Sequence, residues 1–384
     1  MKTSHGVEMD HFWGTRERPM LPRELIRRNP ILASSEMPSE LRRLSSTRAV
    51  YISTADGEEP ITEVTKMETI GRRTIWRVKV SDTGGEAAHR LGQAAVRYDP
   101  SHVCQAIDRS VSSEGHRPAW LNQLFIPRGI ARPTRPRLRR FNGRRVEPMY
   151  VFGNDDRQTY EDTSYPWGCV GKIFNSDGFQ GSGALVGKNL VITAAHMVPW
   201  TSIGAGSWWM RFVPAYVNGT SLFGSGVESN ISDAAAINNG NNVSGYDWAL
   251  LKLYNPVGET AGWFGYNGWS SDWEKQNYWT VLGYPTAVGG GELPSWQGGI
   301  DYHDEDSDSS GGEELESNTA DITPGDSGGP VFGIWNGNAP RVIGVVSGQE
   351  HEYQPIFSSD DNNIFASGSG FTNLIAWGLT NWPA

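Results

Sequence analysis

Three separated segments of the chain place a serine, a histidine and an aspartate where each could take part in nucleophilic chemistry. Ser327 lies in the run GDSGGPVF, a glycine-rich turn that should expose its hydroxyl and aim backbone amides at one point. His196 ends the apolar run LVITAAH, and Asp247 precedes the apolar run WALLKL. A serine attacks a carbonyl carbon when a base takes its proton and N–H groups receive the charge that develops on oxygen. The gaps of 51 and 80 residues leave room for strands that bring the three together.

The segments around these residues indicate the elements that must position them. After about residue 150, short apolar runs alternate with turns rich in Gly, Asn and Ser, which predicts an all-β fold. Residues 371–379 instead space their apolar side chains at helical intervals, so we expect a helix packed outside the sheets. The expected strands are 181–186, 191–195, 248–253, 278–283, 331–334 and 341–347.

The three motifs together resemble a known family. TAAH, YDWALLKL and GDSGGPVF are similar to the corresponding segments of chymotrypsin-fold serine peptidases, which share the order His, Asp, Ser. The runs VFGNDDR, YPW and VGKI further resemble the glutamyl endopeptidase-like branch. The resemblance covers roughly residues 146–384. It implies a double six-stranded β-barrel with a C-terminal helix, and a serine endopeptidase that acts on proteins or peptides without a cofactor or a metal.

The resemblance implies a role for each residue of the site. His196 would take the proton of Ser327 and return it to the leaving amine, while Asp247 would orient the imidazole. The amides of Gly325 and Ser327 would form the oxyanion hole, as the family turn does. The alternative is a non-enzymatic protein that uses the barrel as a peptide-binding or scaffolding module. The complete triad favours the enzyme.

Two apolar residues stand where glutamyl endopeptidases typically hold a substrate carboxylate. Those enzymes use a hydroxyl residue five positions before the serine and a histidine on the strand beyond it, and this chain has Ile322 and Val346 there. Burying a carboxylate against two alkyl groups leaves its charge unpaired, which is costly. We therefore expect no strict preference for glutamate.

Further pocket residues follow from the same comparison. Asp321 stands where trypsin-like relatives keep the acid that binds Arg or Lys, so it indicates either cleavage after these residues or a structural role. A preference for a small or apolar residue is the next alternative. The strand that contains Val346, Ser347 and Gly348 should pair with the substrate backbone, as extended peptides do at a sheet edge.

The opposite charges of the two parts of the chain predict docking and latency. Residues 1–150 carry 26 Lys and Arg against 17 Asp and Glu, a net charge of +9, whereas residues 151–384 carry 7 against 26, a net charge of −19. Such parts attract each other within a Debye length of roughly 8 Å at physiological salt. We expect a basic pro-segment over 1–145, of mixed or poorly ordered structure, that docks on a peptidase domain over 146–384. The released segment should still inhibit at low salt.

The segment 127–145 is rich in Arg and Pro and predicts a processing site. It contains Arg-Arg pairs at 139–140 and 144–145, which processing peptidases cut; a nucleic-acid-binding or solvated linker is the alternative. In chymotrypsin-like relatives a cut before an apolar residue frees an amino group that pairs with the aspartate before the serine. The resemblance thus implies that a cut after Arg145 frees Val146 to pair with Asp326.

Three remaining features bear on stability, metals and location. Cys104 and Cys169 are the two cysteines, which form either a bridge across the processing site or two buried thiols. The acidic run 304–316 has Ser309 and Leu315 where an EF-hand needs Gly and Glu, which favours a solvated loop over a calcium site. No apolar run suits a secretory leader or reaches the roughly 18 residues of a membrane span. The resemblance and the dibasic segment nevertheless favour secretion, and we expect neither a nucleic acid nor a membrane as partner.

Overall fold

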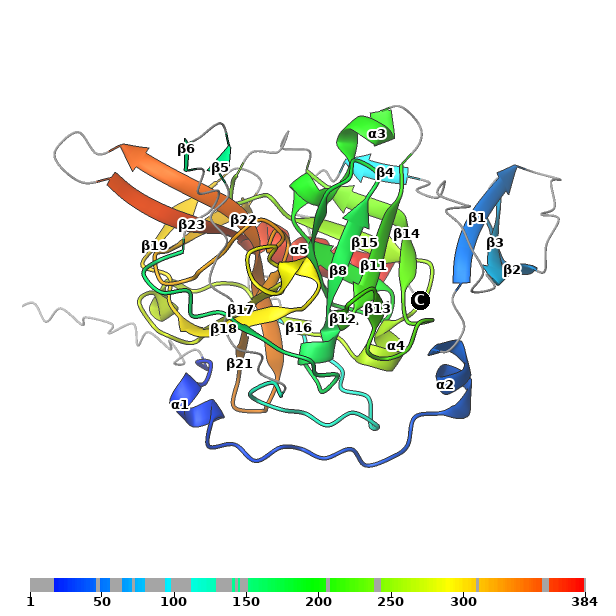
Figure 1. Cartoon of the computed structure of the whole chain (residues 1–384), viewed down its shortest axis with the longest axis horizontal. Helices are drawn as coiled ribbons and strands as arrows, with labels where there is room; N and C mark the ends of the chain where they lie inside the picture. The colour runs from blue at the N-terminus through cyan, green and yellow to red at the C-terminus, as the bar shows by residue number, and fades with distance from the viewer. Residues whose placement is uncertain are drawn as a thin grey trace, which may run out of the picture.

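Two β-sheet systems dominate the protein, with short helices around them and one longer helix near the C-terminus (Figure 1). No helix among the described residues combines the length and the apolar character needed to span a bilayer. The computed structural model describes residues 17–45, 49–55, 64–70, 73–79, 94–97, 112–128, 140–141, 144–145, 151–204, 208–237, 243–308, 311–353 and 359–382.

Six strands of the first sheet close into a barrel. They follow the order β11-β8-β9-β10-β15-β14, and β14 pairs again with β11, which completes the ring. β4 (Ala94–Arg97) adds to β14 in parallel. The barrel strands carry near-continuous buried runs, such as all four residues of β10, because both their faces are covered. Their bounds are β8 Val170–Asn175, β9 Gln180–Leu185, β10 Leu190–Thr193, β11 Met210–Pro214, β14 Ser229–Ala236 and β15 Ala249–Leu253.

Apart from β7, the strands of the second sheet system follow the first barrel along the chain. Its order is β19-β20-β23-β22-β21-β17-β18-β7, and β16 pairs with β22. Aromatic rings fill its core; for example, the ring centroids of Trp269 and Trp279 are 5.5 Å apart and those of Trp273 and Trp335 are 5.8 Å apart. The bounds are β7 Gln158–Thr159, β16 Gly265–Tyr266, β17 Trp279–Gly283, β18 Ser295–Ile300, β19 Asp304–Ser307, β20 Glu313–Ser317, β21 Pro330–Ile334, β22 Pro340–Tyr353 and β23 Ser359–Ser367.

Each strand expected after residue 150 is present, with ends shifted by a few residues. β22 is the largest departure, since it continues from residue 347 to Tyr353 through its pairing with β23. The C-terminal helix, α5 (Ser369–Asn381), buries Phe371, Leu374 and Ile375 in the barrel core, which confirms the predicted helix. The remaining short elements are α3 Trp200–Gly204, α4 Gly258–Ala261, β12 Tyr216–Val217, β13 Thr220–Ser221 and the 3-10 helices η2 Trp167–Cys169, η3 Ala195–Met197, η4 Ser271–Trp273 and η5 Gly289–Gly291.

The N-terminal part is more structured than its polar sequence suggests. Residues 17–45, which the sequence predicts to be poorly ordered, contain α1 (Pro22–Leu25) and α2 (Ser39–Ser45) and bury Met20 and Leu25. β3 (Arg73–Lys79) is the central strand of a sheet of order β1-β3-β2, with β1 Ala49–Ala55 and β2 Val64–Ile70. Within the basic segment, β5 (Arg140–Phe141) pairs with β6 (Arg144–Arg145).

Candidate active site

The register of two neighbouring strands brings His196 and Asp247 together. β10 and β15 are antiparallel, and Thr193 at the end of β10 pairs with Ala249 at the start of β15. His196 follows β10 in the turn η3, and Asp247 comes two residues before β15. The pairing therefore closes the gap of 51 residues between the two side chains.

Asp247 is fully buried and accepts three hydrogen bonds. Its Oδ1 accepts the backbone N–H of His196 at 2.9 Å, and its Oδ2 lies 2.7 Å from His196 Nδ1. Ser347 Oγ donates to the same Oδ2 at 2.6 Å. Because an ionised carboxylate only accepts hydrogen bonds, this contact favours the imidazole tautomer with its proton on Nδ1. The other ring nitrogen, Nε2, is then the acceptor that a general base needs.

The surroundings of His196 stabilise its protonated form more than water stabilises the protonated form of a free histidine side chain. Burial lowers the pKa of His196, but the charge of Asp247 and the hydrogen bond to it outweigh burial and raise this pKa above the ordinary value of 6.5. The imidazole can thus hold a proton that it has accepted, with Asp247 stabilising the cation.

Backbone hydrogen bonds hold the turn around Ser327. Asp326 N donates to Thr323 O at 3.0 Å, and Gly329 N donates to Asp326 O at 2.7 Å. From the first barrel, Ser182 N donates to Ser327 O at 2.8 Å, and Ser182 Oγ donates to Gly325 O at 2.7 Å. The turn is therefore fixed to both sheet systems.

The same turn packs against the strand end that carries His196. Gly328 has φ +75°, a conformation that favours glycine, and a Cβ there would collide with Thr193 Oγ1 and lie 2.7 Å from Ala194 N. Thr193 and Ala194 come directly before the turn η3 of His196. The structure thus places the predicted nucleophile, base and orienting acid in one region between the two sheet systems.

Two amides of the turn have the properties expected of an oxyanion hole. Within the described part of the chain, neither Gly325 N nor Ser327 N donates a hydrogen bond to another protein group. Gly325 adopts φ +106°, and Ser327 is 7% exposed, so the turn lies near the surface without being open to bulk water. Both amides are available to a negatively charged oxygen.

A buried ion pair lies directly behind the turn. Arg157 Nη1 donates to Asp326 Oδ2 at 2.9 Å and to Thr323 Oγ1 at 2.7 Å. Arg157 also forms a two-point contact with Asp155, through Nη2 at 2.7 Å and Nε at 2.9 Å. Burial raises the pKa of Asp326 to about 6, and the charge of Arg157 opposes this rise. The predicted partner of Asp326, Val146, lies outside the described residues, so that pairing stays a prediction.

Asp321 uses its carboxylate within the protein. It is 1% exposed, and its two oxygens accept the backbone amides of Phe152 at 2.8 Å and Asp156 at 2.9 Å. Its own amide donates to Gln297 Oε1 at 2.6 Å. Burial raises the pKa of Asp321, and the two backbone hydrogen bonds oppose the rise. The structural role considered for this aspartate fits these contacts.

The other predicted pocket residues lie on or beneath the strand after the turn. Ile322 and Val346 are fully buried and belong to the aromatic core of the second sheet system. Val346 O accepts Gly328 N at 2.8 Å, and Ser347 Oγ donates to Asp247 Oδ2 at 2.6 Å. Gly348 is approached by Val243, whose side chain would collide with a Cβ at this position.

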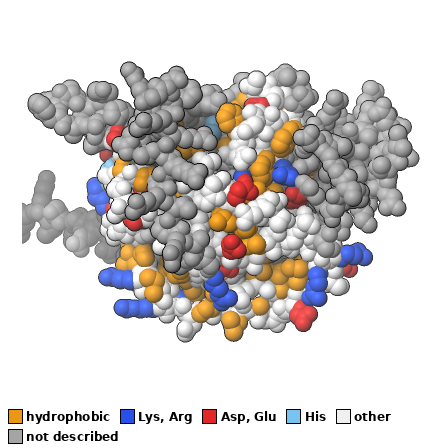
Figure 2. Space-filling view, in the orientation of Figure 1, with side chains coloured by type: hydrophobic (Ala, Val, Ile, Leu, Met, Phe, Trp, Pro, Cys, Tyr) orange, Lys and Arg blue, Asp and Glu red, His pale blue; other side chains and the backbone are white. Residues whose placement is uncertain are grey.

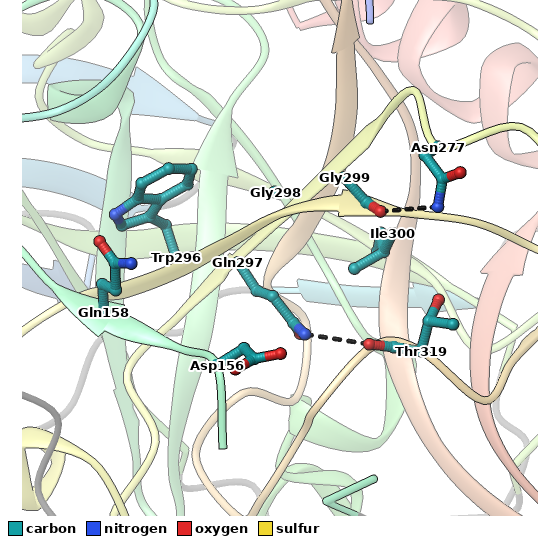
Figure 3. Close-up of a pocket in the computed structure, with 9 residues that line it drawn as sticks. All are labelled: Asp156, Gln158, Asn277, Trp296, Gln297, Gly298, Gly299, Ile300 and Thr319. Atoms are coloured by element: carbon teal, nitrogen blue, oxygen red, sulfur yellow. Dashed lines mark hydrogen bonds between the residues drawn. The ribbon is translucent and has the colours of Figure 1, made fainter. Parts of the chain in front are cut away.

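Figure 3 shows a polar pocket of about 370 Å³. Two of its lining residues, Asp156 and Gln297, contact Asp321. Gln297 crosses its wall and donates to Thr319 O at 2.9 Å, and Asn277 Nδ2 donates to Gly299 O at 2.9 Å. No triad residue lines this pocket, so it is separate from the nucleophile. Its lining residues are Asp156, Gln158, Asn277, Trp296, Gln297, Gly298, Gly299, Ile300 and Thr319.

The acidic run and the cysteines have local explanations. In the acidic run, β19 (Asp304–Ser307) pairs antiparallel with β20 (Glu313–Ser317), and Asp304 lies opposite Glu316. Among the described residues, no group of three or more His, Cys, Asp or Glu side chains is arranged to hold a metal ion. Cys169 is a buried free thiol whose Sγ contacts Ala261 O at 3.3 Å, and burial raises its pKa. Cys104 lies outside the described residues.

Sequence reasoning missed three residues that support the site. In the sequence, Arg157 stands out only as the last residue of the run VFGNDDR. In the structure its guanidinium neutralises Asp326, 169 residues further along the chain. Ser182 holds the Ser327 turn, and Ser347 holds Asp247. The two aspartates directly before Arg157 were the sequence signal for an ion pair, whereas nothing in the runs around the two serines distinguishes them from other strand residues.

Comparisons with known proteins agree with this geometry. Residues 156–358, more than half of the chain, match the sequence model of the Trypsin family. This protein therefore belongs to the trypsin family. A glutamyl endopeptidase of Bacillus licheniformis is 32% identical over 137 residues, which are 35% of this chain and 42% of that relative. The chain thus matches less than half of the length of this relative.

Two solved structures are also similar. One is a Glu endopeptidase in complex with MPD, with a TM-score of 0.47 and 19% identity over 60% of this chain and 100% of the other. The second is the thermostable serine protease AL20 of an extremophilic microorganism, with a TM-score of 0.39 and 22% identity over 56% of this chain and 98% of the other. With the family match, the predicted chymotrypsin-like fold is confirmed: a closed six-stranded barrel, a second sheet system and a C-terminal helix.

Proposed function

We propose that this chain is a serine endopeptidase with Ser327 as nucleophile, His196 as general base and Asp247 as the acid that orients the imidazole. One observation carries the proposal. Asp247 contacts His196 through both carboxylate oxygens, while the Ser327 turn packs against the residues just before His196. Membership of the trypsin family supports the same chemistry.

In the proposed reaction, His196 Nε2 takes the proton of Ser327 Oγ as this oxygen bonds to the substrate carbonyl carbon. The amides of Gly325 and Ser327 donate to the oxyanion, which is worth about 2.7–4 kcal/mol for each donor. The imidazolium then protonates the leaving amine, and the C–N bond breaks to leave an acyl-enzyme. Water repeats the sequence, with His196 again as base, and releases the acid and free Ser327.

A fluorophosphonate probe tests this proposal against the alternative of a non-enzymatic peptide-binding module. The probe reacts with activated serines, so it should label the wild-type chain on Ser327 and leave the His196→Ala variant unlabelled. Mass spectrometry of the labelled peptide identifies the serine. If neither the full-length protein nor the chain cut within 140–151 is labelled, the proposal is contradicted.

The pH dependence of activity should report the raised pKa of His196. The base must be neutral, so kcat/KM should rise with pH through an apparent pKa above 6.5. Asp247→Asn removes the charge that raises this pKa, so the transition should move to lower pH while kcat falls about 10⁴-fold. Rates on a fluorogenic peptide between about pH 5 and 9 measure both effects. An unchanged transition in Asp247→Asn would show that another group controls it.

The enzyme should not require a charged substrate residue immediately before the cleaved bond. Ile322 and Val346 are buried alkyl groups, and both oxygens of Asp321 already accept backbone amides. We therefore expect small or apolar residues to be preferred over Glu, and over the Arg or Lys that Asp321 alone would suggest. A peptide library profiled by mass spectrometry measures the preference, with Asp321→Asn as the matched variant. The prediction is wrong if the profile is dominated by Glu. It is also wrong if the profile is dominated by Arg or Lys and this preference disappears in Asp321→Asn.

We also propose that the chain is exported and made as a zymogen that is cut within 140–151. The dibasic pairs at 139–140 and 144–145 support the cut. Because Arg157 already neutralises Asp326, a new N-terminus is not needed to form the turn around Ser327. The proposed latency therefore depends on inhibition by the basic segment. N-terminal sequencing of the active form, beside an Arg139/Arg140/Arg144/Arg145→Ala variant, tests it. Full activity of the uncut variant is the contrary result.

A further inference from the structure

We propose that the N-terminal part remains bound after the chain is cut, so that the processed protein consists of two chains. The inference rests on the proposed processing within 140–151. We call residues 17–45 and 112–128 the strap. The strap contacts both sheet systems, and the bonds proposed to be cut follow its last residue, Arg128.

The first half of the strap joins the end of β21. Met20 N donates to Ile334 O at 2.8 Å, and Trp335 Nε1 donates to Glu17 O at 2.9 Å. Gly226 N donates to Ser45 O at 2.7 Å at the other end of this half. These contacts anchor residues 17–45 at both ends.

The second half of the strap forms paired backbone hydrogen bonds with residues 263–266. Ser113 and Tyr266 exchange bonds of 3.0 and 3.2 Å, and His116 and Trp263 exchange bonds of 2.8 and 3.0 Å. Gly115 between them has no room for a side chain, since a Cβ would lie 2.6 Å from Gly265 N. The backbone of the strap therefore pairs with residues 263–266 on both sides of Gly115.

Apolar side chains of the strap belong to the protein core. Met20, Leu25, Leu124 and Phe125 are 2–6% exposed and lie in the same core cluster as the first barrel. The indole of Trp167, itself fully buried, donates to Leu124 O at 2.9 Å. Loss of the strap would expose this core and leave a buried donor without a partner.

The strap lies at the opposite end of the molecule from Ser327. Met20 binds Ile334 at the far end of β21, a strand that spans about 13 Å and begins three residues after Ser327. In Figure 1, residues 22–45 run along the bottom, whereas α3, which follows His196, lies at the top. The described strap therefore supports the fold without covering the nucleophile.

These contacts depend little on charge, unlike the docking expected from net charge. The ion pair between Arg341 and Glu114 is screened by salt, because the Glu114 side chain is 66% exposed. Figure 2 shows Lys and Arg side chains along the lower edge as single groups among hydrophobic and uncharged ones. Backbone pairing and apolar burial should hold the strap at high salt.

A cut in the basic segment separates two anchored ends. On one side, Arg128 N donates to Asp162 Oδ2 at 2.7 Å, and Glu161 N donates to Arg128 O at 3.3 Å. On the other side, Phe152 N donates to Asp321 Oδ1 at 2.8 Å. Cleavage between 129 and 151 leaves both sets of contacts in place.

The test uses full-length protein that carries Ser327→Ala and a recognition sequence for a site-specific protease in place of residues 133–139. After complete cleavage, the two fragments should co-elute from a size-exclusion column both at low salt and in 1 M NaCl (about ten times the ionic strength at which the Debye length is 10 Å). Separation at either salt concentration would overturn the proposal. Because this variant lacks the proposed nucleophile, the outcome does not depend on the protein being a peptidase.

Matched variants identify the contacts responsible. Phe125→Asp should reduce retention of the cut N-terminal fragment at least tenfold, whereas Ile26→Asp should not, since Ile26 is 69% exposed. Circular dichroism before cleavage shows whether each variant folds, and Met20→Ala replaces Phe125→Asp if that variant does not. Equal retention in the core variant and in Ile26→Asp would contradict the assigned contacts.

Discussion

Replacement of Ser327 or His196 by alanine should lower kcat by about 10⁶-fold and leave KM and the melting temperature nearly unchanged. Ser327 supplies the oxygen that bonds to the substrate, and His196 supplies the base without which that oxygen stays protonated. The two residues act as one unit, so the double variant should be no slower than either single variant. Steady-state rates on a fluorogenic peptide, with purified protein checked by circular dichroism, measure these effects.

Two controls separate loss of chemistry from general damage. Ser271→Ala changes an exposed serine of the second sheet system, and His116→Ala changes an exposed histidine at the opposite end of the molecule. Both should keep wild-type kcat. If either Ser327→Ala or His196→Ala retains more than about a tenth of the activity, the triad assignment is wrong, because the loss for a triad member is several orders of magnitude.

Removal of the guanidinium behind the nucleophile turn should reduce both the stability of the protein and its turnover. Arg157→Met leaves Asp326 buried without its cation, which should reduce the free energy of unfolding by about 3–5 kcal/mol. The turn that aims the amides of Gly325 and Ser327 should then lose its geometry, and kcat should fall by about 10²–10³-fold. Denaturant unfolding and steady-state kinetics measure the two effects separately.

A double variant distinguishes positioning from stability. Arg157→Met/Asp326→Asn removes both charges, so it should recover part of the lost stability while kcat stays low. Arg157→Lys keeps the charge without the planar two-point geometry and should lie between wild type and Arg157→Met. Arg211→Met, at an ion pair of the first barrel, is the control and should leave kcat unchanged.

The pH profile gives this prediction a second readout. Burial raises the pKa of Asp326 to about 6 even with Arg157 present, and Arg157 lowers it. Without Arg157 the pKa should rise further, so Asp326 should take up a proton at a higher pH. The acid limb of kcat should shift upward in Arg157→Met but not in Arg211→Met. An unshifted limb would show that Arg157 does not act through Asp326.

The sequence predicts the proposed catalytic residues because each lies in a short motif whose spacing agrees with strand geometry. The apolar runs before His196 and after Asp247 predict strands, and their antiparallel register then places the two side chains together. The glycines around Ser327 predict a turn, and Gly328 does adopt a conformation that favours glycine. The β-fold followed from the same runs of residues.

Other features depend on contacts between residues that are distant along the chain. The local sequence around Asp321 does not reveal whether its carboxylate faces a pocket. In the structure it accepts the backbone amides of Phe152 and Asp156. The apolar residues of the strap follow no regular period, so nothing in its sequence indicates that Met20 and Leu25 enter the core of a distant barrel. Such roles follow from tertiary packing, which overrides local composition.

The anchoring of Phe152, Asp156 and Arg157 to the loop before Ser327 also bears on how accurate maturation must be. These three residues are fixed by Asp321 and Asp326 whatever precedes them in the chain. A terminus produced at any bond within 140–151 would therefore leave a tail of varying length ahead of the same fixed anchor. If the chain is cut as proposed, peptidases of low site precision would yield N-termini of different lengths ahead of the same anchored turn, and activation would not require one dedicated processing enzyme.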